Sequence, residues 1–146
     1  MAASRGATRS RPGLQARRLA LMALFEEDFR PRQAVRALER LAEERAVTDD
    51  VAEHARGIVA GVAGHRSLID DRIVALAPAI PLSELGRVER AILRSAIYEV
   101  LYSAATPSGE AISDAVSLAR IYAGDAARRL VNGVLGSVSR SSGGGA

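Results

Sequence analysis

The sequence predicts an all-α protein, because apolar residues recur at helical spacing along almost the whole chain and clear helix breakers separate the periodic segments. No stretch of useful length alternates between apolar and polar residues as a half-buried strand does. Helices that have no sheet to cover must bury their apolar stripes against one another. A compact helical domain with short loops is therefore expected.

The first half of the chain contains three expected helices. The first covers residues 14–28 and ends before Pro31, a residue that suits the first position of a second helix. The third begins after Thr48, whose side chain can cap it, and continues to about Leu76 with or without a break near Gly64. The stripe that the second helix is expected to bury consists of Val35, Leu38, Leu41 and Ala42.

The second half contains three more expected helices. One starts at Leu82 or Arg87 and ends at Tyr102, because prolines precede it and residues 106–109 break the chain after it. The next covers residues 111–122. The last buries the stripe Leu130, Val131, Val134, Leu135 and Val138.

Composition favours one domain without cysteine chemistry. The 146 residues are 48% hydrophobic and include no cysteine, which excludes disulfides and thiolate catalysis. No apolar run approaches the roughly 20 residues of a membrane span. The Arg- and Ser-rich start resembles a mitochondrial transit peptide, but a cytoplasmic bacterial protein is the favoured interpretation.

The charge is unevenly distributed. Residues 1–25 contain five arginines and no acid, whereas the remainder contains fifteen arginines and seventeen acids. A basic arm on a near-neutral body is typical of an electrostatic contact with nucleic acid. A solvated, disordered tail would have the same composition.

Nothing in the sequence indicates a catalytic or metal site. The two histidines, His54 and His65, are eleven residues apart, which is about 16 Å along a continuous helix and too far for one metal ion. The glycine-rich residues 57–64 lack both the Gly-Lys-Ser/Thr ending and the preceding strand of a phosphate loop. Gly57 and Gly61 are better explained by close approach of another helix.

Five blocks in order resemble the NusB family. Residues 87–99 (RVERAILRSAIYE) and 130–135 (LVNGVL) are the most informative, and residues 111–120 (AISDAVSLAR) lie between them. Residues 16–25 (ARRLALMALF) and 58–70 match two further blocks near the start. Ser113-Asp114 and Leu130 depart from the family pattern.

The resemblance implies two packed helical bundles, no cofactor and no catalytic activity. It implies a transcription antitermination factor that binds boxA RNA together with NusE, a small-subunit ribosomal protein, on RNA polymerase during ribosomal RNA transcription. We expect a flexible basic arm over residues 1–13, the helical domain over 14–138 and a disordered Ser/Gly tail over 139–146.

The resemblance and the charge layout together predict an RNA-binding surface. Arg17 is expected to contact a phosphate or a base, and Phe25 and Tyr122 to stack on bases. The other candidates are arginines in or beside the arm, and charged residues within or just before two of the blocks that resemble the family. The full predicted set is Arg9, Arg11, Arg17, Arg18, Phe25, Glu89, Arg90, Tyr122, Arg128 and Arg129.

Two alternatives to an RNA-bound antitermination factor remain at this point. The chain is either a homodimeric interaction module whose RNA surface is covered, or a NusB-like domain related to RNA cytosine methyltransferases. Light scattering with and without RNA and NusE separates the first alternative from the leading hypothesis.

Overall fold

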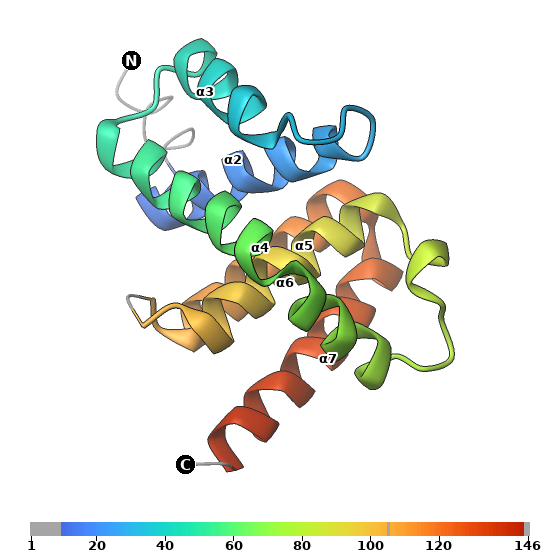
Figure 1. Ribbon diagram of the computed structural model, residues 1–146. Coiled ribbons are helices and arrows are strands. Elements are labelled where there is room, and N and C mark those ends of the chain that lie inside the picture. Colours follow the sequence, from blue (N-terminus) through green and yellow to red (C-terminus); the bar gives the residue numbers. More distant parts are fainter. Residues whose placement is uncertain (1–9, 105, 145–146) are drawn as a thin grey trace.

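The computed structural model describes residues 10–104 and 106–144, and it confirms the all-α prediction for these ranges (Figure 1). The α-helices and one short 3-10 helix follow in order as α2 (Pro12–Glu27), α3 (Ala34–Glu44), α4 (Asp49–Leu76), η1 (Leu82–Glu84), α5 (Arg87–Tyr102), α6 (Ser108–Ala123) and α7 (Asp125–Gly144).

The helices form two groups that share α4. Helices α2, α3 and the first part of α4 pack together, and α5, α6 and α7 pack together beside the later part of α4 (Figure 1). Helix α2 also contacts α5 and α6, so it lies against both groups. The position of α2 between the groups is the main determinant of the site described below.

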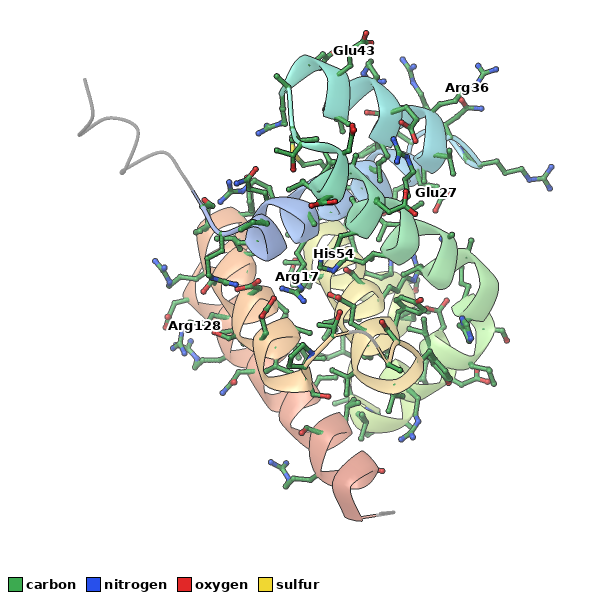
Figure 2. All side chains as sticks on the ribbon, turned by 90° about the vertical axis from the view of Figure 1, so that its left-hand side faces the viewer. Arg17, Glu27, Arg36, Glu43, His54 and Arg128 are labelled. Atoms are coloured by element: carbon green, nitrogen blue, oxygen red, sulfur yellow. The ribbon has the colours of Figure 1, made fainter. Side chains whose placement is uncertain are left out.

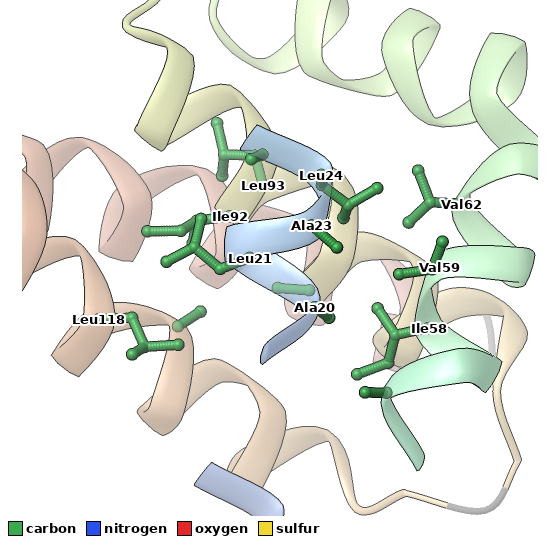
Figure 3. Close-up of a cluster of buried hydrophobic side chains, with 14 of the residues drawn as sticks. Ala20, Leu21, Ala23, Leu24, Ile58, Val59, Val62, Ile92, Leu93 and Leu118 are labelled. Atoms are coloured by element: carbon green, nitrogen blue, oxygen red, sulfur yellow. The ribbon is translucent and has the colours of Figure 1, made fainter. Parts of the chain in front are cut away.

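The core is continuous across both groups. Leu24 of α2 and Val59 of α4 face one another, while Leu21 of α2 lies on the other side of its helix near Ile92 and Leu118 (Figure 3). A helix that meets neighbours on two sides must be apolar on more than one face. Most of the middle of α2 is accordingly buried: Ala16, Leu19, Ala20, Leu21, Ala23 and Leu24.

Two expectations for α3 are wrong. The helix begins at Ala34 and not at Pro31, because Arg32 adopts a φ of 66°, which no right-handed helix accepts. Val35 is 60% exposed, since the buried stripe runs through Ala34, Ala37, Leu38 and Ala42 at helical spacing and Val35 lies off that stripe.

Helix α4 has the expected cap and a break close to the expected place. The backbone N–H of Val51 donates to Thr48 Oγ1 at 3.3 Å. The helix is kinked at His65, next to Gly64, where φ of −123° and ψ of 16° depart from helical geometry. Of the two glycines expected to allow close packing, Gly61 does so, because a Cβ there would collide with the ring of Tyr98. Gly57 is exposed and no neighbour approaches it, so that expectation is wrong.

The last helix is longer than expected. Helix α7 continues to Gly144, whereas disorder was expected from residue 139. Extending a formed helix by a residue costs much less than starting one, so α7 propagates past its last buried side chain, Val138. Residues 145–146 lie outside the described ranges.

Candidate nucleic-acid interface

A buried cluster of charges lies where α2 meets α5 and α6. Arg17 is 3% exposed, and its Nε and Nη2 donate to the two carboxylate oxygens of Glu99 at 2.7 and 3.2 Å. Its Nη1 donates to Asp114 Oδ2 at 2.7 Å and to Glu110 Oε2 at 2.8 Å. One guanidinium from α2 thus binds three carboxylates on two other helices.

Three further side chains complete this cluster. His54 of α4 lies with Nε2 at 3.0 Å from Glu99 Oε2, and Thr106 Oγ1 donates to the same oxygen at 3.0 Å. Arg11, at the N-cap of α2, binds Asp114. We refer to Arg11, Arg17, His54, Glu99, Thr106, Glu110 and Asp114 as the Arg17 cluster.

The Arg17 cluster keeps its buried groups charged. Burial opposes the charge of Arg17, yet the hydrogen bonds that its guanidinium donates to Glu99, Glu110 and Asp114 hold its pKa above the ordinary value. Burial likewise tends to raise the pKa of Glu99, but hydrogen bonds from His54 and Arg17 lower that pKa overall. Hydrogen bonding from Arg17 also lowers the pKa of Glu110. Each buried charge therefore has partners that offset its loss of hydration.

The placement of Arg17 does not favour the predicted phosphate contact. Its guanidinium points into the protein between the helices (Figure 2), and the carboxylates of Glu99, Glu110 and Asp114 occupy its donors. The next residue, Arg18, is rotated by about 100° from Arg17 about the helix axis and is half-buried.

Arg90 is also committed to structure. Its Nη2 donates to Asp28 at 2.8 Å, and its Nη1 donates to the carbonyl oxygen of Leu82 at 3.1 Å. Asp28 follows α2, where the helix dipole disfavours an acid, so a cation beside it compensates. Arg90 therefore fixes the end of α2 against η1 and the start of α5.

An exposed apolar cavity brings Phe25 and Tyr122 together. These two aromatic residues, predicted separately, line one surface cavity of about 350 Å³. Tyr122 is 44% exposed, and Phe25 makes an edge contact with Phe29 at 5.3 Å between ring centroids. The remaining lining residues are Leu21, Met22, Glu26, Leu41 and Val88. We call this the aromatic cavity.

The remaining predicted residues lie around these two features. Glu89, in the first turn of α5, folds back against the N-cap residue Gly86. Arg128 donates to Asp125 at 2.7 Å and Arg129 binds the same carboxylate, both on the surface. Arg9 lies outside the described residues.

Arg18 belongs to a second, polar cavity that the sequence did not indicate. It lines a space of about 200 Å³ together with Arg45, Gln15, Ser10, Leu19 and Val47. Arg45 comes from the end of α3, so only the packing of α3 on α2 brings the two arginines to one place. We call this the basic cavity.

Within residues 10–104 and 106–144, no helix is both long and apolar enough to cross a membrane. The same described ranges contain no group of three or more histidine and acidic side chains arranged to hold a metal ion.

Comparison with known proteins decides the family. The NusB family profile matches residues 14–140, which is most of the chain. The chain belongs to the NusB family. The resemblance drawn from the five sequence blocks is thereby confirmed.

Curated relatives and solved structures agree with this assignment to NusB. The transcription antitermination protein NusB of Dehalococcoides mccartyi is 35% identical over 127 residues, covering 87% of this chain and 89% of that protein. That of Symbiobacterium thermophilum is 40% identical over 134 residues, covering 86% and 88%. A crystal structure of antitermination factors NusB and NusE in complex with dsRNA superimposes with a TM-score of 0.81 at 28% identity, covering 91% of this chain and 99% of that one. A T. maritima NusB structure gives 0.82 at 28% identity, covering 91% and 93%.

The fold brings several residues into the site that the sequence did not predict there. Met22, Leu41 and Val88 join the aromatic cavity, and only Met22 has a sequence signal, since it lies three residues before Phe25 on the same helix. Arg45 carried no signal, because it comes from a helix for which no family block was found.

Proposed function

We propose that this protein is an RNA-binding transcription antitermination factor that binds boxA-type RNA together with NusE. The observation that carries the proposal is the superposition on a NusB chain solved with NusE and dsRNA, because 99% of that chain is covered. The curated relatives are antitermination proteins that match most of their length. Within the antitermination complex on RNA polymerase, the protein acts as a scaffold for ribosomal RNA transcription.

The aromatic cavity is the surface we assign to RNA bases. Bases of single-stranded RNA are recognised by stacking on aromatic side chains, and Phe25 and Tyr122 supply two such rings at one opening. Met22 and Leu41 add apolar contact area beside them. Arg87 lies over the ring of Phe29 at 4.7 Å, which brings a cation to the same end of α2.

The arginines of the arm provide the electrostatic part of the binding. Arg9 belongs to an acid-free segment, and Arg11, whose side chain is 55% exposed although it also binds Asp114, leads directly into α2. Arg128 and Arg129 add positive charge near the start of α7, although both share Asp125. Phosphate neutralisation of this kind makes affinity fall steeply with salt.

Arg17 and Arg90 act in this proposal as positioning residues. Arg17 fixes the rotation of α2 about its axis through Glu99 and Asp114, and that rotation sets where Phe25 points. Arg90 holds the end of α2 through Asp28. Neither guanidinium needs to touch RNA, and no covalent chemistry is assigned to the protein. A cytoplasmic location follows from the proposed role on nascent transcripts.

The test is an RNA-binding titration with and without NusE. Fluorescently labelled boxA-type RNA is titrated with the full chain, and the dissociation constant is measured at several salt concentrations. For about four phosphate contacts with single-stranded RNA, the logarithm of the binding constant should fall with the logarithm of the salt concentration with a slope of about −3.

Two outcomes would contradict this proposal. One is absence of RNA binding at low salt even with NusE. The other is a homodimer in light scattering that neither RNA nor NusE dissociates, which would favour an interaction module whose RNA surface is covered.

A further inference from the structure

We propose that the basic cavity is a phosphate-binding subsite, and that its ligand is one backbone phosphate of the RNA whose bases stack at the aromatic cavity. The inference rests on the proposed RNA-binding function and adds to it a defined subsite formed by Arg18 and Arg45.

The charges of the lining favour an oxyanion. Arg18 and Arg45 contribute two guanidinium groups, and none of the residues that line the cavity is acidic. Gln15 and Ser10 add polar groups, and the Gln15 side-chain amide donates to the carbonyl oxygen of Ser10 at 2.6 Å. Guanidinium groups bind phosphate with two parallel hydrogen bonds, which makes arginine well suited to this role.

Arg18 itself carries the second observation. Its Nε is buried and is the one buried side-chain nitrogen or oxygen, among the described side chains, without a hydrogen-bond partner. A buried donor without a partner is costly, so such groups in native proteins normally point to a ligand or a water. An oxyanion in the basic cavity would accept from this N–H.

The neighbouring arginine shows that the missing partner is not a general property of this helix. Arg17 has carboxylates around its donors, whereas neither Arg18 nor Arg45 forms an ion pair within the part of the chain that the structure describes. Among the described residues, no carboxylate therefore competes with a ligand for these two arginines.

The two cavities border the same pair of helices. Met22 of α2 and Leu41 of α3 line the aromatic cavity, and Arg18 and Arg45 line the basic one. Each arginine lies four residues, one helical turn, from its apolar counterpart and so on the same face. Seven residues separate Arg18 from Phe25, which is about 10 Å along α2. One RNA strand can therefore place a base at Phe25 and a phosphate at Arg18.

The experiment compares Arg18→Gln, Arg45→Gln and the double variant with the native chain in the titration with NusE and 5′-hydroxyl boxA-type RNA. Losing one charge-assisted phosphate contact should weaken binding by about tenfold. It should also make the salt slope less steep by about 0.7. Arg36→Gln is the matched control, because Arg36 lies nine residues before Arg45, on the opposite face of α3, and projects away from the fold (Figure 2).

A second series of RNAs locates the phosphate. Each RNA carries one uncharged methylphosphonate at a different position. At one position the neutral linkage should weaken binding to the native chain about tenfold and have no further effect on the double variant. A further measurement adds inorganic phosphate alone and records the melting temperature of the protein. It tests whether the cavity binds a free anion instead of an RNA phosphate.

The outcomes separate this inference from the proposed function. If the native chain and the double variant bind RNA equally well, the subsite is overturned while the function stands. The same holds if the substitutions weaken the binding of inorganic phosphate but not that of RNA. If the native chain does not bind RNA, both fall. If Arg18→Gln lowers the melting temperature, the RNA affinity of Arg45→Gln alone decides whether the subsite exists, because Arg45 is exposed.

Discussion

Arg17 and Arg18 are adjacent in α2, yet the fold gives them opposite environments. Arg17 is buried among Glu99, Glu110 and Asp114, whereas Arg18 borders a surface cavity without an ion-pair partner among the described residues. The difference is a rotation of about 100° about the helix axis. It teaches that in an arginine-rich helix the rotational position, rather than the residue type, decides which cation holds the fold together and which is available to a polyanion.

The largest expected effect comes from removing the buried cation. Arg17→Met should destabilise the fold by about 3–5 kcal/mol, because it leaves the buried carboxylates of Glu99 and Asp114 without their counter-charge. Urea denaturation followed by circular dichroism measures the change. Arg56→Gln is the control, since Arg56 pairs with Glu39 on the surface and its loss should leave the unfolding midpoint unchanged. Equal stability of Arg17→Met and the native chain would contradict the structural role.

The next effect concerns the aromatic cavity, where Phe25 of α2 meets Tyr122 of α6. Phe25→Ala and Tyr122→Ala should each weaken RNA binding by about 1–3 kcal/mol, the usual value for a stacked base. The melting temperature should change little for Tyr122→Ala, because that ring is half exposed. Ile121→Ala is the matched control, since Ile121 is exposed beside Tyr122 but does not line the aromatic cavity. Unchanged RNA affinity in both aromatic variants would show that the RNA bases bind at another surface.

The smallest effect is a dependence of stability on pH. Hydrogen bonds lower the pKa of Glu99 and Glu110 in the folded protein, so the folded state holds these protons less tightly than the unfolded state does. Their stabilisation is complete above the unfolded pKa of about 4.3 and is lost as the pH falls through the lower folded pKa. Melting temperatures measured down to about pH 3 should therefore drop more steeply for the native chain than for Glu99→Gln. A parallel drop in the melting temperatures of both proteins would show that other acids determine the pH dependence of stability. Glu84→Gln, which changes an exposed acid, is the control.

The elements were predictable from sequence because helical periodicity and breakers are local signals. Thr48 as a cap and the break near Gly64 follow from residue chemistry alone. The start of α3 was not predictable, because the positive φ of Arg32 is a property of the turn rather than of the residue type.

The burial of Arg17 could have been predicted from the spacing of apolar residues on its helix, but the resemblance to the family pointed to an RNA contact instead. Arg17 shares a helical face with Leu21 and Leu24, four and seven residues later, and both are buried. Its partner Glu99 likewise lies within a run of buried residues on α5. Two opposite charges, each embedded in an apolar face, indicate a buried pair. The pairing of Arg18 with Arg45 had no such signal, because it depends on how α3 packs on α2.

The Arg17 cluster ties together helices from both groups. Arg17 of α2 holds Glu99 of α5 and Asp114 of α6, and Glu99 in turn holds His54 of α4. Pulling the groups apart would strip every one of these charges of its partner at once, so neither group can melt alone at low cost. We therefore expect the domain to unfold as one cooperative unit with a single thermal transition, in spite of its two-part architecture.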